Sequence, residues 1–341
     1  MKDLLVAGGG PVGLAAAIHG RLAGLTVVVV EPRVGVIDKA CGEGLMPGAV
    51  AALRALGVAP AGRPFHGIRY VCPDGQAEAR FRAGPGLGVR RTRLHAALRE
   101  RADELGVEVV RGRVEDVVQE ADQVHAAGLR ARWMLAADGL HSPVRRVLGL
   151  DDNDRATSGP TRFGQRRHFG IAPWSDLVEV HWSTDAEAYV TPVDDDVVGV
   201  AVLCGPGRRF DDVLAGFPAL TDRLRGAQPM AGVRGAGPLR QDAAARRAGR
   251  VLLVGDAAGY VDALTGEGLS TGLATAAAAV GAVAAGRPQD YERAWRAATR
   301  PYRLLTTSLL RASQVPAVRP YLVPAARRFP GLFARAVDLL A

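Results

Sequence analysis

Residues 3–31 read DLLVAGGGPVGLAAAIHGRLAGLTVVVVE, and this stretch decides the fold. An apolar run ending at Ala7 is followed by three glycines, an alanine-rich segment around residues 15–18, and a second apolar run, residues 27–30, that ends at Glu31. These patterns predict a strand, a glycine turn, a helix and a second strand. The stretch therefore has the order and length of one βαβ unit.

The glycine spacing in this unit, Gly8-x-Gly10-x-x-Gly13, predicts a site for the pyrophosphate of a dinucleotide. The first glycine permits a tight turn, the second lets a phosphate approach the backbone, and the third lets the helix pack closely on the strand. The phosphate charge would then lie at the helix N-terminus, where Pro11 and Val12 are further candidate cofactor-binding residues.

A carboxylate at the end of the second strand indicates which dinucleotides fit. Glu31 follows Gly13 at the spacing at which a side chain can bind both hydroxyls of a ribose, which favours FAD or NAD over a cofactor with a 2′-phosphate. Arg33 is a candidate partner for a phosphate or for adenine, with an exposed surface arginine as the alternative.

The composition indicates a soluble globular chain with no nucleic-acid partner and no metal site. Its 341 residues carry a net charge of +8, but the 43 basic residues are spread along the chain without a long cluster. The cysteines, Cys41, Cys72 and Cys204, have neither disulfide-framework nor zinc spacing, which fits a reducing cytoplasm. The first residues predict a strand rather than a signal peptide, and the apolar run 273–286 is too short to span a bilayer.

Two later segments distinguish FAD from NAD. Residues 135–145 (LAADGLHSPVR) and 254–259 (VGDAAG) resemble the paired Asp-Gly and Gly-Asp motifs of a flavoprotein family. This family includes para-hydroxybenzoate hydroxylase, flavin halogenases and geranylgeranyl reductases. With the N-terminal glycine turn they stand in the family's order, so the resemblance implies an FAD site that contains Asp138, Gly255 and Asp256.

The resemblance also assigns roles to matching positions. Asp256 would bind the ribityl chain or the flavin-side ribose, and Arg91 would open a helix beneath the cofactor, with Arg90 as the competing candidate. Val114 would hold the adenine through its backbone. Gly266, Gly268 and Leu269 would place backbone N–H groups beside the flavin, where a helix start provides a positive dipole end.

The segment 39–47 (KACGEGLMP) resembles both the Cys-Gly segment of geranylgeranyl reductases and the Gly-Glu-x-Leu-x-Pro segment of flavin halogenases. A thiol at Cys41 near the flavin could donate a proton after hydride transfer, or it could be a small side chain packed against the ring. Halogenation is disfavoured because the only lysines are Lys2 and Lys39 and no Trp-x-Trp signature is present.

The remaining sequence divides into further predicted elements. A helix is expected over 91–105, strands over 107–110, 113–118, 132–138 and 250–254, and short helices over 302–341. Short alternating runs such as 177–182 and 197–203 indicate an antiparallel sheet in a second domain. There Tyr189, Pro192 and His181, with His168 and Trp182, are candidate substrate contacts, although a buried aromatic is more often core.

We therefore predict an α/β fold with a Rossmann-type FAD-binding domain, an antiparallel β substrate domain and a C-terminal helical cap. The predicted boundaries are 1–65, 90–153 and 236–285 for the FAD-binding domain, 66–89 and 154–235 for the substrate domain, and 286–341 for the cap.

The predicted function is an NAD(P)H-using FAD monooxygenase that hydroxylates an aromatic or lipid-like small molecule. The alternative is a reductase of prenyl or polyene C=C bonds with Cys41 as proton donor. A third hypothesis is a non-catalytic flavin-binding or membrane-surface protein that uses the basic C-terminal segment.

Overall fold

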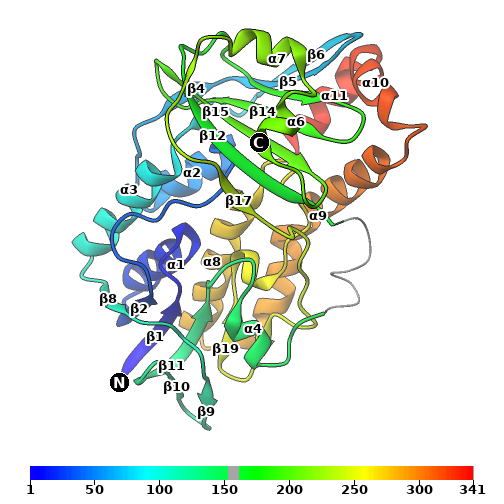
Figure 1. The fold of residues 1–341 in the computed structure, drawn as a ribbon. Coiled ribbons are helices and arrows are strands. Elements are labelled where there is room, and N and C mark those ends of the chain that lie inside the picture. The colour runs from blue at the N-terminus through cyan, green and yellow to red at the C-terminus, as the bar shows by residue number, and fades with distance from the viewer. Residues whose placement is uncertain (153–160, 341) are drawn as a thin grey trace.

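A computed structural model describes residues 1–152 and 161–340, in which two large β-sheets lie one above the other (Figure 1). The first sheet has eight strands in the order β18-β19-β11-β1-β2-β8, with the hairpin β9–β10 attached to β11. Its strands are β1 (Lys2–Ala7), β2 (Val27–Glu31), β8 (Glu108–Arg111), β9 (Val118–Gln119), β10 (Val124–Ala126), β11 (Leu129–Ala136), β18 (Arg247–Ala248) and β19 (Val251–Leu253).

The predicted βαβ unit forms the centre of this sheet. β1 and β2 run parallel in the register Leu4↔Val27, joined by α1 (Pro11–Leu22). Both strands are apolar nearly throughout because helices cover both faces of a parallel sheet. A Cβ on Gly20 would lie 2.8 Å from Val27 Cγ2, so the missing side chain lets α1 lie close to β2.

The second sheet also has eight strands, in the order β16-β12-β15-β14-β13-β5-β6, with β17 paired to β12. Its pairs are antiparallel as predicted, except that β13 and β5 run parallel. β5 belongs to a hairpin that reaches this sheet long before β13 along the chain, and a parallel pair needs such a long crossover connection. The strands are β5 (Gly67–Cys72), β6 (Gly75–Arg80), β12 (Phe163–Gly170), β13 (Val178–Trp182), β14 (Glu187–Pro192), β15 (Val197–Cys204), β16 (Gln228–Pro229) and β17 (Arg234–Ala236).

A third, small sheet and the helices complete the fold. The small sheet has the order β3-β7-β4, with β3 (Gly44–Leu45), β4 (Arg63–Phe65) and β7 (Gly86–Gly88). The helices are α2 (Pro47–Ala55), α3 (Arg91–Glu104), α4 (Pro143–Val147), α6 (Phe210–Leu214), α7 (Pro218–Arg223), α8 (Gly268–Ala284), α9 (Tyr291–Gln314), α10 (Leu322–Arg328) and α11 (Pro330–Asp338), with 3₁₀ turns η1 (Gly255–Ala258), η2 (Pro288–Asp290) and η3 (Arg319–Tyr321).

Two predicted elements need correction. Residues 113–117 do not form a strand, because the chain leaves the edge of the sheet after β8 and residues Arg113 and Val114 line a cavity instead; the next strand, β9, begins at Val118. The C-terminal region is not made of short helices only, since α9 continues through Pro301 for 24 residues. One buried face that includes Trp295, Tyr302 and Leu310 runs along α9, so its packing outweighs the roughly 3 kcal/mol that an internal proline costs a helix.

The apolar core has three parts. One surrounds the parallel sheet, one lies between the second sheet and α9–α11, and one lies under α6 and α7. Among the described residues, no helix is both long enough and apolar enough to cross a membrane. The domain boundaries remain predictions, and the one at 153/154 lies outside the described residues.

Candidate functional site

One cavity of about 930 Å³ lies between the two large sheets. It begins at the carboxyl ends of β1, β2, β11 and β19, where open α/β sheets bind ligands, and continues to the inner face of β5, β13 and β14. Its volume is at the upper end of the range for small-molecule sites, about 300–1,000 Å³. The predicted site residues that line it are Gly8, Gly10, Pro11, Val12, Glu31, Arg33, Cys41, Arg91, Val114, Asp138, Tyr189, Asp256, Gly266, Gly268 and Leu269.

The glycine turn has the geometry that its spacing predicts. Gly8 has φ +99°, and a Cβ on Gly13 would lie 1.8 Å from the Gly8 carbonyl oxygen. The missing side chain of Gly13 therefore lets α1 pack against the backbone of the turn, and Gly13 does not line the cavity. A Cβ on Gly10 would meet no atom of the described residues within 4 Å apart from its chain neighbours, which leaves the start of α1 open to an approaching ligand.

Glu31 is buried and held in place from two sides. Its Oε2 accepts the Gly9 N–H at 2.7 Å, and its Oε1 accepts the Arg33 backbone N–H at 3.0 Å and Nε at 2.7 Å. Burial raises the pKa of Glu31, but the hydrogen bonds from Arg33 and Gly9 outweigh it and hold the pKa below its usual value. The carboxylate is therefore charged and oriented, and the Arg33 side chain is bound to Glu31.

The two distant motifs are joined by an arginine whose role the sequence did not indicate. The buried Arg145 donates to the carbonyl oxygens of Leu140 and Ala257, one beside each motif, at 3.2 and 3.1 Å. Asp138 Oδ2 accepts the Val144 N–H at 3.0 Å, so it holds the start of α4. Burial raises the pKa of Asp138.

Gly255 supports the cavity wall without lining it. It has φ +59°, and a Cβ there would lie 3.0 Å from Val12 Cγ1. Val12 also packs against Gly272, where a Cβ would lie 2.5 Å from Val12 Cγ2. Glycines at both positions therefore let α1, the turn after β19 and α8 meet around one valine.

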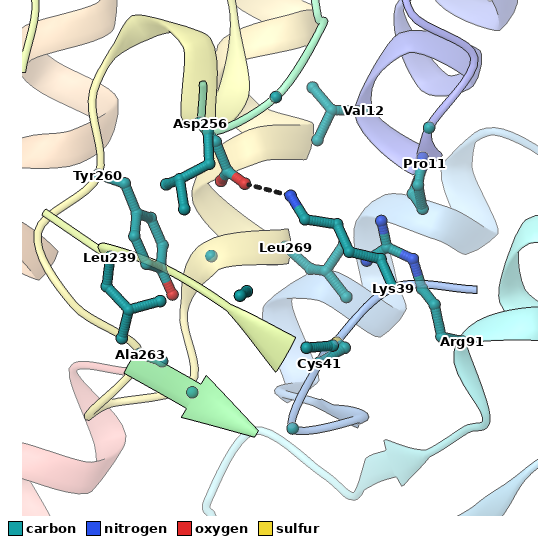
Figure 2. A pocket seen from close by; sticks show the side chains of 18 of the residues that line it. Pro11, Val12, Lys39, Cys41, Arg91, Leu239, Asp256, Tyr260, Ala263 and Leu269 are labelled. Atoms are coloured by element: carbon teal, nitrogen blue, oxygen red, sulfur yellow. Dashed lines mark ion pairs between the residues drawn. The ribbon is translucent and has the colours of Figure 1, made fainter. Parts of the chain in front are cut away.

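Lys39 extends into the middle of the cavity. Figure 2 shows its side chain reaching Asp256, and Nζ lies 3.6 Å from Asp256 Oδ2. Arg91 faces the same space from the start of α3, and its buried Nε has no hydrogen-bond partner within the described residues. No local pattern marks Lys39 as a site residue, because only the folded chain brings it to Asp256.

A buried carboxylate, Glu43, and its hydrogen bonds hold the loop that carries Cys41. Glu43 has φ +61° and is 2% exposed; it accepts the Arg91 backbone N–H at 2.9 Å and His168 Nε2–H at 2.6 Å. The Glu43 N–H in turn lies 3.4 Å from Cys41 Sγ. Thr191 of β14 donates its hydroxyl to the Gly42 carbonyl oxygen at 2.8 Å. The Cys41 loop is therefore fixed to the second sheet at two points.

The far part of the cavity is apolar. Tyr189 faces it, but its hydroxyl donates to the Leu264 carbonyl oxygen at 2.8 Å. Burial raises the pKa of Tyr189 and of Tyr260 well above the usual value, so both phenols are neutral. Other side chains that line this part are Ile68, Tyr70, Val178, Val180, Leu203, Leu239 and Leu340.

Two predicted substrate contacts are not in the cavity wall. Successive side chains of a strand point to opposite faces, and β13 turns Val178 and Val180 to the cavity. His181 lies on the other face and pairs with Glu179 at 3.1 Å. Pro192 is buried against β7, where a Cβ on Gly88 would lie 1.7 Å from the Pro192 carbonyl oxygen. Of the other two candidates, His168 holds Glu43 and Trp182 packs on Tyr70.

The start of α8 also lines the cavity. Gly266 has φ +74° with open space at its Cβ position, and α8 begins at Gly268. Glu267 between them is buried, which raises its pKa to about 8, and its Oε1 has no hydrogen-bond partner in the part of the chain that is described. The positive end of the α8 dipole therefore faces the cavity beside a carboxyl group that is neutral at pH 7.

These features fit a bound dinucleotide. Asp138 Oδ1 and Arg91 Nε are buried polar atoms that find no hydrogen-bond partner among the described residues, and both residues line the cavity. Such atoms are costly unless a ligand or water satisfies them. Glu31 stands at the ribose position of a βαβ unit, and Gly10 leaves the helix start open. Within the described residues, no cluster of three side chains can hold a metal ion.

The comparisons with known proteins agree with this geometry. Residues 1–165 match a family model described as FAD binding domain. Menaquinone reductase of Mycolicibacterium smegmatis is 30% identical over 86% of this chain and 79% of its own length. Digeranylgeranylglycerophospholipid reductase 1 of Methanothermobacter thermautotrophicus is 27% identical (86% and 82% covered), and para-nitrophenol 4-monooxygenase of Pseudomonas sp. is 28% identical (80% and 75%).

Solved structures show the same fold. The flavin-dependent brominase Bmp2 superposes with a TM-score of 0.82 at 18% identity, over 99% of this chain and 93% of its own. The flavin-dependent halogenase CmlS superposes with a TM-score of 0.78 at 21% identity, over 89% of this chain but only 62% of its own. At these identities the likeness concerns the fold alone.

Proposed function

The chain belongs to the FAD-dependent oxidoreductases, and from this premise we propose that it reduces a carbon–carbon double bond in the prenyl chain of a lipid-like substrate, with NAD(P)H as electron donor. The observation that carries the proposal is the position of Cys41. Its thiol lies in the cavity wall on a fixed loop, in the same cavity as the start of α8 and the apolar side chains of the second sheet.

The residues that would hold FAD are spread over the polar part of the cavity. Glu31 would bind the adenosine ribose, and Arg91 and the backbone at Gly10 would face the pyrophosphate. Asp256 would bind the ribityl chain, which requires Lys39 to release it. Gly266 and Gly268 would contact the flavin ring. Bound in its reduced form, FAD supplies a hydride to the substrate.

Cys41 would provide the proton that completes the reduction. One alkene carbon gains the hydride, the other gains the proton from Sγ, and solvent reprotonates the thiolate, so that the product gains two hydrogens. The hydrogen bond from the Thr191 hydroxyl to Gly42 and the burial of Glu43 hold the loop, so Sγ has little freedom to move away. Proton donation depends on such fixed geometry.

The apolar part of the cavity favours a hydrocarbon chain as substrate. Tyr189 uses its hydroxyl on Leu264, so it offers the substrate only its ring. A polar aromatic substrate would lose hydrogen bonds to water on entering this region, whereas an isoprenoid chain has none to lose. Menaquinone reductases and digeranylgeranylglycerophospholipid reductases are among the relatives, and their names refer to lipids.

Hydroxylation with O₂, the function first predicted from the sequence, is the second candidate. It is favoured by the similarity to para-nitrophenol 4-monooxygenase and to rifampicin monooxygenase of Streptomyces venezuelae, which is 26% identical over 80% of this chain. Halogenation stays disfavoured, because the only lysines are Lys2 and Lys39 and no Trp-x-Trp signature is present.

The test is an anaerobic turnover assay of the FAD-loaded protein with NAD(P)H and prenylated quinones or prenyl lipids in detergent. We expect a product two mass units heavier in H₂O and three mass units heavier in D₂O, because one of the two added hydrogens comes from solvent through the thiol. Cys41→Ala should lower the rate by about 10²–10⁴-fold, the usual contribution of a general acid, without changing FAD affinity. Cys72→Ser is the matched control, since Cys72 is free but does not line the cavity.

Either of two results would overturn the proposal. A product that gains one oxygen atom and requires O₂ would assign the chain to the monooxygenases. A Cys41→Ala variant that reduces the double bond at the wild-type rate would show that the thiol donates no proton.

A further inference from the structure

Exposed apolar side chains concentrate in the C-terminal helices. Of the fourteen large hydrophobic side chains that are exposed within the described residues, seven lie between residues 304 and 339. Figure 1 shows this segment, coloured orange to red, on one side of the molecule. The seven are Leu304, Val315, Val318, Tyr321, Phe329, Leu332 and Leu339.

Several of these residues are not needed for packing inside the chain. α11 already buries Phe333 and Val337 in the core beneath it. On its outer side, Leu332 and Leu339 are each 69% exposed, and the exposed Arg335 lies between them. Spacings of three and four residues place these three side chains on one helical face, so α11 carries apolar groups both inward and outward.

The charge in this region is almost entirely positive. Residues 301–340 contain six arginines and one acidic residue, Asp338, which pairs with Arg82 at 3.2 Å. Two of the arginines, Arg303 and Arg319, pair with Asp242 and Glu187 of the body. The other four are exposed and form no ion pair within the described residues; they are Arg311, Arg327, Arg328 and Arg335.

We propose that these seven apolar side chains and four arginines, here called the C-terminal face, dock the protein on a bilayer that contains anionic lipid. Exposed leucine and aromatic side chains interleaved with arginines are what an interfacial helix presents to lipid. The arginines would meet the anionic headgroups while Phe329 and Leu332 enter the acyl boundary. A second copy of the chain fits less well, because a two-fold interface would bring the unpaired arginines of both copies together.

The C-terminal face is also next to the cavity. Leu340, which follows the exposed Leu339, is buried and lines the same cavity as Tyr70 and Leu239. Docking would therefore bring the apolar part of the cavity close to the bilayer, where lipid-like substrates reside. The inference goes beyond the proposed reaction and does not depend on it, since it rests on exposure and charge alone.

The test is co-sedimentation of the FAD-loaded protein with two kinds of vesicle, one of phosphatidylcholine and one of phosphatidylcholine mixed with phosphatidylglycerol. We expect binding to the mixed vesicles that weakens at high salt, and little binding to phosphatidylcholine alone. The double variant Phe329→Ser/Leu332→Ser should lose binding. Val118→Ser is the matched control, because Val118 is 55% exposed on β9, in the other sheet.

The charge contribution is measured separately. Arg328→Gln and Arg335→Gln should each weaken binding about 5-fold, which corresponds to the ~1 kcal/mol that one arginine contributes at an anionic surface. Arg225→Gln, which removes an exposed arginine near α7, should leave binding unchanged.

Three results would overturn the inference: no binding to the mixed vesicles at low salt, equal binding by the Phe329→Ser/Leu332→Ser variant, or a dimer in analytical ultracentrifugation that the same variant dissociates. Turnover of detergent-solubilised substrate by that variant reports on the proposed reaction independently.

Discussion

Replacing Gly10 and Gly13 by alanine, one at a time, should distinguish the glycine that the fold needs from the glycine that the cofactor site needs. In Gly13→Ala the new Cβ would lie 1.8 Å from the Gly8 carbonyl oxygen and 3.3 Å from Ala137 Cβ. The nearest atom is backbone, so α1 and the turn must move apart. We expect a loss of about 3 kcal/mol in the free energy of unfolding, the upper end of the usual cost of overpacking.

Gly10→Ala should have the opposite profile. Gly10 has φ −69° and ψ 175°, which any residue adopts, and a Cβ there would meet no atom within 4 Å in the part of the chain that the structure describes, its chain neighbours aside. Alanine at position 10 should stabilise the folded state by about 0.4–1 kcal/mol, because the unfolded chain becomes less flexible. It should destabilise the folded state by about the same amount, because alanine is a poorer N-cap residue than glycine. The apoprotein should therefore keep its stability to within about 1 kcal/mol. The methyl group would, however, occupy the space through which a pyrophosphate approaches, so the dissociation constant for FAD should rise about 10–100-fold, or 1.4–2.7 kcal/mol.

The assay combines thermal unfolding of the apoproteins, followed by circular dichroism, with titration of FAD followed by its fluorescence. Gly281→Ala calibrates the series, because Gly281 lies inside α8 with open space around its Cβ position and the change should stabilise by about 0.8–1 kcal/mol. A Gly10→Ala variant that binds FAD like the wild type, or that loses as much stability as Gly13→Ala, would refute the reasoning.

Three further changes have definite expected results. Glu267 has a pKa of about 8 in the folded protein against 4.5 for an unperturbed glutamate, so between these two pH values the folded protein binds a proton that the unfolded chain has lost. The free energy of unfolding should therefore fall as pH rises through this window, by at most about 1.4 kcal/mol per pH unit. The melting temperatures of the wild-type apoprotein and of Glu267→Gln should diverge across this pH range, and parallel curves would argue against a buried neutral carboxyl. Glu31→Ala should weaken FAD binding by about 10–100-fold through the loss of charge-assisted hydrogen bonds to the ribose, measured by calorimetric titration; unchanged affinity would remove Glu31 from the site. Tyr189→Phe should lower the unfolding free energy by about 1–2 kcal/mol, because the buried Leu264 carbonyl loses its donor, while turnover persists; a full loss of turnover would assign the phenol a chemical role.

Local patterns predicted the fold of the first thirty-one residues well. The strand, the glycine turn, α1 and Glu31 follow one another within thirty-one residues, so propensity and spacing determine their arrangement without help from distant contacts. The Asp138 and Asp256 motifs were placed by resemblance, and both residues line the cavity.

The second half depended on contacts that no local pattern encodes. His168 and Glu43 are 125 residues apart, and Lys39 reaches Asp256 only because the two sheets meet. The position of His181 on the face of β13 away from the cavity could not be predicted from the sequence. Both faces of β13 are buried, so the hydrophobic pattern does not show which face lines the cavity. Because successive side chains of a strand point to opposite faces, assigning the wrong face to the cavity selects the wrong set of side chains.

The two attachments of the Cys41 loop have a consequence for recombination between relatives. Glu43 binds His168 of β12 and Gly42 binds Thr191 of β14, so the loop of the first domain takes its shape from strands of the second. A chimera that exchanged only the second domain would import a new substrate surface and also release or displace the thiol. The two domains are therefore not interchangeable modules, and a donor domain must bring its own equivalents of His168 and Thr191 to hold the Cys41 loop in its present shape.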